Sequence, residues 1–253
     1  MSAQARPMTS SWLTPQDHPL LAKDEVHIWL ARLDQWEPEA QYFLASLSPD
    51  ERRRAERFHF QQHRVRFITA RYILRTLLGR YLQLKPEQLR FDYNAYGKPS
   101  LAGGEDQTAL RFNLSHAHEL ALYAFARDRE VGLDLEYIRH DFACEEIAEH
   151  FFSDREVAAL RALPANQRRE AFFNCWTRKE AYVKALGEGL SVALDGFDVS
   201  LAPGEPAALL SVRDKTEQWL HWSLRELTPG AGYVAAVAVE GGGWKLKCWQ
   251  WSG

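Results

Sequence analysis

Two acidic residues stand two positions apart in the segment from Val131 to Ile138, where apolar residues occupy the alternate positions. This period of two predicts a half-buried strand with Asp134 and Glu136 on the same face, about 7 Å apart. Taken alone, the pair favours a solvated strand face, because exposed acids are common and interact weakly. The alternative is a Mg²⁺ site, since this ion takes one or two carboxylates and fills its other positions with water and phosphate oxygens.

A third carboxylate lies in the segment from Cys175 to Lys184, which predicts a helix with Trp176, Glu180 and Lys184 one turn apart. One interpretation is an ordinary surface ion pair between Glu180 and Lys184, worth about 0.3 to 0.5 kcal/mol, with Trp176 in the core. The other interpretation adds Glu180 to the two strand acids. Together with Lys184 they would complete a site that holds both a metal ion and a polyphosphate.

Positive charge is concentrated between residues 52 and 80, where nine arginines accompany a single acid. This imbalance predicts that an anion docks on the segment, with nucleic acid binding and a solvated helix face as alternatives. Two further places suit a phosphate ligand: Lys98 in the turn at residues 96–99, and the pair Ser115 and His116 at the end of a predicted strand. Each is also compatible with a structural role, because a lone histidine at a strand end is often simply hydrogen-bonded.

Capping signals and hydrophobic periodicity predict the elements that must position these residues. Ser48 and Ser153 each begin a capping box, and Gly187 supplies a C-cap for a helix from about residue 168 to 186. Another long helix is predicted over 62–82 by its apolar spacing. Predicted strands span 26–33, 110–115, 119–126 and 131–138, and four or five more follow Gly196. Each half thus combines one long helix with several strands, which favours an α+β architecture of two similar lobes meeting near residues 127–140.

Composition narrows the class of protein. A chain of 253 residues with 46% hydrophobic content can bury a core without disulfides. Its three cysteines, at 144, 175 and 248, form no CxxC or Cys/His cluster, which argues against a disulfide framework or a structural zinc site and favours a reducing compartment. No stretch has the length of a signal peptide or a membrane span, so a cytoplasmic protein is expected.

Four blocks in chain order resemble motifs of the 4′-phosphopantetheinyl transferase superfamily, specifically its Sfp-type branch of surfactin-synthetase activators. They are YGKP (96–99), FNLSHA (112–117), VGLDLE (131–136) and WTRKEAYVKALGEGL (176–190), and the similarity extends over about 26–197. The resemblance implies a monomer of two pseudo-twofold α+β lobes, each a long helix on a small antiparallel sheet, with coenzyme A between them. The expected divisions are a flexible segment (1–23), a first lobe (24–127), and a second lobe with the metal site and carrier-binding region (128–253).

By motif position, the resemblance implies that the magnesium ligands are Asp134, Glu136 and Glu180. It implies that coenzyme A contacts come from basic and hydroxyl side chains in several blocks: Arg54, Arg66, Lys98, Ser115, His116, Lys179 and Lys184. Two residues depart from the family pattern. Many relatives carry Ser or Thr in place of Ala117, and a lysine occurs in the family in place of Glu51.

The implied reaction transfers the 4′-phosphopantetheine moiety of coenzyme A to a serine of an apo acyl or peptidyl carrier protein and releases 3′,5′-ADP. Mg²⁺ would neutralise the acids and polarise the phosphorus under attack. Glu180 is the candidate base, directly or through water, and Lys184 the candidate group that stabilises the leaving nucleotide.

The expected partners are coenzyme A and carriers of fatty acid, polyketide or nonribosomal peptide synthesis, with no nucleic acid and no membrane. Two alternatives stay open. One is a metal-dependent pyrophosphate hydrolase, although no RExxEE helix of the Nudix type is present. The other is a coenzyme A-binding module without turnover, for which three carboxylates would bring no benefit.

Overall fold

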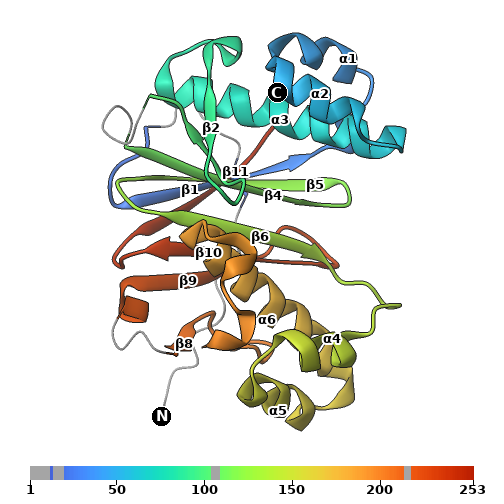
Figure 1. Cartoon of the computed structure of the whole chain (residues 1–253), viewed down its shortest axis with the longest axis vertical. Coiled ribbons are helices and arrows are strands. Elements are labelled where there is room, and N and C mark those ends of the chain that lie inside the picture. The colour runs from blue at the N-terminus through green and yellow to red at the C-terminus, as the bar shows by residue number, and fades with distance from the viewer. Residues whose placement is uncertain (1–11, 14–19, 104–108, 214–217) are drawn as a thin grey trace.

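Two lobes stack through their sheets in the computed structural model, so that the chain forms four layers of helix, sheet, sheet and helix (Figure 1). The structure describes residues 12–13, 20–103, 109–213 and 218–253. One 22-residue helix forms each outer layer: α3 (Gln61–Leu82) in the first lobe and α6 (Ala165–Leu186) in the second. The predicted α+β fold of two similar lobes is therefore confirmed.

The sheet of the first lobe has the order β11-β1-β5-β4. Its strands are β1 (Glu25–Arg32), β4 (Leu110–Ala117), β5 (Leu120–Arg127) and β11 (Lys245–Gln250). One face packs against α3, where Leu74 and Leu77 join Trp29 and Phe125 in a fully buried core. Burial of these large apolar side chains supplies most of the stabilisation of the lobe.

The second lobe repeats this plan with fewer strands. Its sheet has the order β6-β10-β9, formed by β6 (Val131–Tyr137), β9 (Trp222–Leu227) and β10 (Tyr233–Glu240). Helix α6 packs on one face, and its contact with β6 is so close that a Cβ on Gly132 would lie 2.1 Å from the carbonyl oxygen of Ala181. Only glycine therefore allows the helix to approach the strand at this point.

The remaining elements surround these layers. The helices are α1 (Ala40–Phe43), α2 (Pro49–Glu56), α4 (Cys144–Phe151) and α5 (Asp154–Ala162). The strands form two small hairpin sheets: β2 (Phe91–Tyr93) with β3 (Pro99–Leu101), and β7 (Phe197–Val199) with β8 (Leu209–Val212). Local signals set the ends of helices: Ser153 accepts a hydrogen bond from the Glu156 amide at the start of α5, and Gly187 caps the end of α6 with a φ of 73°.

The two sheets meet across an apolar layer and along the neighbouring strands β4 and β6. The layer includes Leu122 from the first lobe and Leu133 and Val237 from the second. Side chains of β4 also accept hydrogen bonds from the backbone of β6: Asn113 Oδ1 from the amide of Leu133 at 2.9 Å, and Ser115 Oγ from the amide of Leu135 at 3.2 Å. These bonds fix how β6 lies against β4.

The C-terminal strand departs from the predicted division at residue 128. Although β11 belongs by sequence to the second part, it pairs in parallel with β1 and completes the sheet of the first lobe. That sheet is consequently mixed rather than purely antiparallel. Part of the segment predicted to be flexible also contacts β11, since the Leu13 amide donates to the Cys248 carbonyl at 3.1 Å. The rest of that segment, apart from residues 12 and 20–23, lies outside the described residues.

Candidate active site in the cleft between the lobes

A cleft of about 530 Å³ opens where the lobes meet, lined by residues of α2, α3, β4, β6, α6 and the turn at 96–99. Seven of the residues singled out in the sequence line it: Arg54, Ser115, His116, Asp134, Glu136, Glu180 and Lys184. They come from segments up to 130 positions apart in the chain. The fold therefore gathers acids of the second lobe and basic groups of both lobes around one space.

Asp134 lies at the base of this cleft and is only 3% exposed. Its Oδ1 accepts hydrogen bonds from Ser115 Oγ at 3.1 Å and from Lys184 Nζ at 2.5 Å. The interpretation of Asp134 as part of a solvated strand face is thus wrong, because strand alternation turns this residue toward α6 and not toward water.

Lys184 joins the two lobes electrostatically. Its Nζ contacts Ser115 Oγ of the first lobe at 3.3 Å as well as Asp134 of the second. Burial alone would lower the pKa of Lys184, but Asp134, assisted by Glu180 and Glu136, raises it. Lys184 accordingly carries a stable positive charge at the cleft, and its partner is Asp134 rather than the Glu180 of a simple surface pair.

Glu136 and Glu180 line the same cleft and are both harder to ionise than usual. Burial, followed by repulsion from Asp134, raises the pKa of Glu136 to about 7. Burial and Asp134 likewise raise the pKa of Glu180, while Lys184 works in the opposite direction. Three acids thus repel one another in a partly dehydrated space, which a bound cation would relieve.

One oxygen of the acid cluster is especially suited to bind a divalent cation. Asp134 Oδ2 is buried and has no hydrogen-bond partner, and a buried acceptor left without a partner is costly. Among the described residues, no three His, Cys, Asp or Glu side chains converge closely enough to enclose a metal on their own. An ion that keeps water and phosphate oxygens as ligands, as Mg²⁺ does, matches such an open set of carboxylates.

The opposite wall of the cleft is basic. His116 lines it, and the pKa of this imidazole is lowered by desolvation and then by the positive charges of Lys184, Arg66 and Arg54. Arg54 lies on the cleft wall. Arg66 is not among the lining residues, but it is close enough to influence His116 electrostatically. The concentration of cations at one wall favours an anionic ligand.

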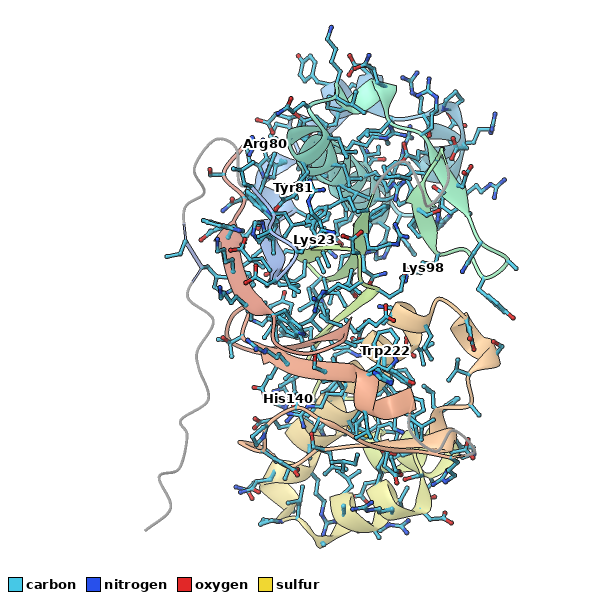
Figure 2. All side chains as sticks on the ribbon, turned by 90° about the vertical axis from the view of Figure 1, so that its left-hand side faces the viewer. Lys23, Arg80, Tyr81, Lys98, His140 and Trp222 are labelled. Atoms are coloured by element: carbon cyan, nitrogen blue, oxygen red, sulfur yellow. The ribbon has the colours of Figure 1, made fainter. Side chains whose placement is uncertain are left out.

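Lys98 lies at the junction of the lobes beside this cleft (Figure 2). Its Nζ donates to Glu130 Oε2 at 2.7 Å and to the Ala185 carbonyl at 2.8 Å. It lines an adjoining hollow of about 320 Å³ that also includes Glu180 and Lys184. Lys98 therefore stands next to the acids but is already paired across the lobes.

Lys179 departs from its predicted role. Its ammonium is fully buried on the far side of α6, where it pairs with Glu156 at 2.7 Å and donates to the carbonyls of Leu194 and Phe197. One residue of helix turns a side chain by about 100°, so Lys179 points into the lobe while Glu180 points into the cleft. In this structure Lys179 anchors α6 and does not reach a ligand in the cleft.

Sequence reasoning missed the contributions of Asn113, Glu51 and Arg71. Asn113 holds β6 through the amide of Leu133, and its place in the FNLSHA block was the available signal. By sequence Glu51 is only a departure from the family pattern, yet it is 1% exposed and pairs with Arg71. The excess of arginines suggested a solvated basic face, so it gave no sign that Glu51 would be buried against the arginines of α3.

Comparisons with known proteins agree with this geometry. The model of the 4′-phosphopantetheinyl transferase superfamily matches residues 130–238, and a model of the 4′-phosphopantetheinyl transferase N-terminal domain matches residues 34–127. The two matches correspond to the second and first lobes and include every element that lines the cleft.

Individual relatives cover most of the chain. The 4′-phosphopantetheinyl transferase HetI of Nostoc is 45% identical over 95% of this chain and 98% of its own length. A putative 4′-phosphopantetheinyl transferase of Synechocystis is 34% identical over 78% of this chain and 77% of its own. The 4′-phosphopantetheinyl transferase Sfp of Bacillus subtilis is 31% identical over 64% of this chain and 70% of its own.

Proposed function

This chain belongs to the 4′-phosphopantetheinyl transferase superfamily, and we propose that it transfers the phosphopantetheine arm of coenzyme A to a serine of an apo carrier protein in a reaction that uses Mg²⁺. Its relatives include enzymes of the Sfp type. The observation that carries the mechanism is the position of Asp134, which is buried between Lys184 and Ser115 and keeps one oxygen without a partner.

Asp134, Glu136 and Glu180 are the residues that would hold the metal ion. Bound there, Mg²⁺ would neutralise the acids and the pyrophosphate and make the phosphorus more electrophilic. The unpartnered Oδ2 of Asp134 and the raised pKa values of Glu136 and Glu180 support this assignment, because each feature is costly without a cation.

Glu180 is the group we assign to accept the proton of the carrier serine, directly or through a water molecule. Its pKa is raised by burial and by Asp134, so this carboxylate is a stronger base than an exposed glutamate. Lys184 would stabilise the negative charge that develops on the departing 3′,5′-ADP, since its own pKa is raised and it stays protonated.

The residues proposed to bind coenzyme A are mainly those of the basic wall. His116, Arg54 and Arg66 are proposed to bind phosphates of coenzyme A, and Lys98 to bind it from the adjoining hollow after exchanging its contact with Glu130. Ser115 already donates to Asp134 and accepts from the Leu135 amide. Its proposed contribution is therefore mainly to hold Asp134 in place.

The same proposal includes a cytoplasmic location and action as a monomer. All three cysteines are buried, and Cys144 and Cys175 are free thiols, which suits a reducing compartment. No helix in the described ranges is long and apolar enough to cross a membrane.

The test is mass spectrometry of an apo carrier protein incubated with the enzyme, coenzyme A and Mg²⁺, with carriers of fatty acid, polyketide and nonribosomal peptide synthesis side by side. We expect one carrier to gain a single phosphopantetheine on its serine, with an equal amount of 3′,5′-ADP released. Release of the nucleotide with no carrier modified would indicate a hydrolase instead. Binding of coenzyme A with neither product would indicate a module without turnover.

A further inference from the structure

A second hollow, of about 560 Å³, continues from the basic wall of the cleft into the first lobe. The two spaces share four lining residues: Arg54, Phe67, Arg71 and Tyr93. Arg53 and Arg57 of the α2 region add further positive charge to the second hollow. Asp50 and Glu51 also line this hollow, but its four arginines outnumber them, so a long anion held at the acids of the cleft could extend into this space.

Arg71 differs from the other arginines of this hollow in being held rigidly. Arg53, Arg54 and Arg57 are exposed, whereas Arg71 is 6% exposed. Its Nε donates to Glu51 Oε1 at 2.6 Å, and its guanidinium carbon lies 4.8 Å from the centre of the Phe91 ring. Little conformational entropy remains for this side chain to lose when a ligand binds.

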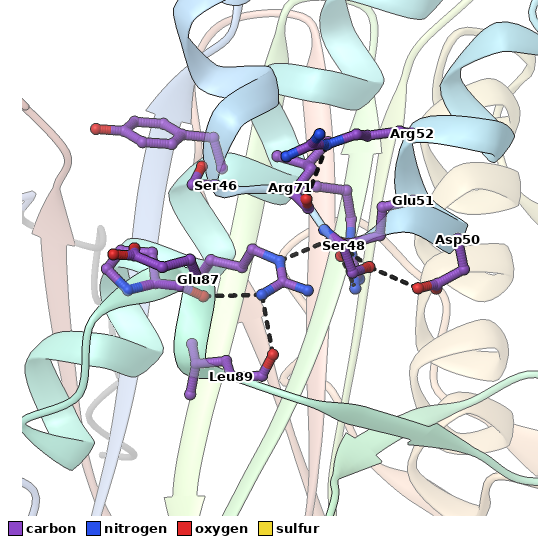
Figure 3. A network of polar contacts seen from close by, with 12 residues as sticks. Ser46, Ser48, Asp50, Glu51, Arg52, Arg71, Glu87 and Leu89 are labelled. Carbon is purple, nitrogen blue, oxygen red and sulfur yellow. Dashed lines mark hydrogen bonds and ion pairs between the residues drawn. The ribbon is translucent and has the colours of Figure 1, made fainter.

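Glu51 sets the orientation of Arg71 (Figure 3). One oxygen of this carboxylate binds Arg71 and the other binds Arg75 at 2.7 Å. Burial by itself would raise the pKa of Glu51, but Arg71, the Ser48 amide and Arg75 together lower it. Glu51 therefore stays ionised, and the cluster of two arginines and one acid keeps a net positive charge beside the hollow.

The guanidinium of Arg71 retains capacity for a ligand. Its Nε and Nη2 are used by Glu51, with Tyr93 Oη 3.4 Å from Nη2. Within the part of the chain that the structure describes, Nη1 has no hydrogen-bond partner. Arginine presents its donors in a planar fork that matches a phosphate, so a fixed Arg71 is suited to recognise one.

Resting on the proposed function, we infer that Arg71, positioned by Glu51, is a specificity-determining contact for the phosphate monoester on the ribose of coenzyme A. The pyrophosphate must lie near Asp134 and Lys184 for transfer to occur. The donor's other anion is a phosphate monoester with a charge of about −2 at neutral pH, and it requires a second cationic site. The arginine-lined hollow is continuous with the cleft and supplies that site.

The test compares nucleotides that differ only in this phosphate. Binding of 3′,5′-ADP and of AMP is measured by calorimetry for the wild type, Arg71→Gln and the control Arg64→Gln, which changes an arginine of the same helix that lines neither space. Arg71→Gln leaves Glu51 paired with Arg75, so the fold should survive. We expect this variant to lose about 10- to 100-fold in affinity for 3′,5′-ADP and almost nothing for AMP, while the control changes neither.

Two further variants separate orientation from charge. Arg71→Lys keeps the charge but loses the fork, so its preference for 3′,5′-ADP should fall between those of the wild type and Arg71→Gln. Glu51→Gln should lower the same preference, whereas a merely structural defect would weaken both nucleotides alike. The inference is overturned if the wild type binds both nucleotides equally or if Arg71→Gln leaves their affinity ratio unchanged. Because binding is read without a carrier, these results are independent of whether the protein performs transfer.

Discussion

Asp134→Asn is the substitution that tests the central assignment most directly. The amide has nearly the size of the carboxylate, and its oxygen can still accept from Ser115 Oγ and Lys184 Nζ. The NH₂ group would replace the oxygen that has no partner. The change therefore removes one negative charge from the cleft while leaving its shape intact.

The expected effects on stability and activity differ widely. The Lys184 side chain is 31% exposed, so solvent screens its ion pair with Asp134, and loss of the pair should cost no more than about 2 kcal/mol. Relief of repulsion with Glu136 offsets part of that cost. For a chain of this size, Tm should fall by less than about 8 °C. Transfer should fall by about 10³-fold, since a group that binds the metal and the reacting phosphates is lost.

Three measurements on the same variant decide the matter. Carrier modification is followed by mass spectrometry, Mg²⁺ binding in the presence of coenzyme A by calorimetry, and folding by thermal melting. We expect loss of transfer and weaker Mg²⁺ binding with a nearly unchanged melt. Carbon-detected NMR of the metal-free variant should also show a lower pKa for Glu136 than the value of about 7, because repulsion from Asp134 is removed. Transfer at the wild-type rate, or unaltered Mg²⁺ affinity, would refute the metal assignment.

Three further experiments test separate parts of the structure. Glu180→Gln should reduce the transfer rate by about 10²- to 10⁴-fold, and the rate should recover as pH rises, whereas the rate lost in Lys184→Ala should not recover. The two variants are compared by their pH–rate profiles with an apo carrier protein. Matching profiles would contradict the assignment of Glu180 as base and Lys184 as the group that stabilises the leaving nucleotide. The pKa of Glu136 is raised in the folded state, so the stability that its protonated form provides is complete below about pH 4.5 and is lost as pH rises through about 7. Urea unfolding of the metal-free Glu136→Gln variant should show no such decline in stability. If the variant has the same pH dependence as the wild type, the raised pKa of Glu136 is contradicted. Gly132→Ala should lower the free energy of unfolding by about 3 kcal/mol or more, because its Cβ would overlap the backbone of α6. The control Gly242→Ala has open space around the added Cβ and should be neutral. Equal melting temperatures for the two variants would disprove the close contact.

Local interactions explain why much of the fold was predictable from the sequence. The capping residues Ser48 and Ser153, the terminal Gly187 and the apolar spacing along α3 each act within a few positions of the chain. The boundaries of α3, α6 and the strands β1, β4, β5 and β6 were accordingly predicted to within a few residues. The four motif blocks also indicated the family, and they contain most of the residues that line the cleft.

Only the tertiary structure decided which of these groups meet, because that depends on residues far apart in the chain. Alternation along β6 predicted that Asp134 and Glu136 share a face, but the packing of α6 made that face buried and gave Asp134 its partner Lys184, 50 positions away. The helical repeat turned Lys179 about 100° away from Glu180, so that it lies beside Glu156. Likewise, the sequence between residues 52 and 80 showed only an excess of positive charge. Folding buried Arg71 and Arg75 against Glu51 and left the arginines of the α2 region exposed, because a buried guanidinium requires an acid partner that only the approach of α2 to α3 supplies.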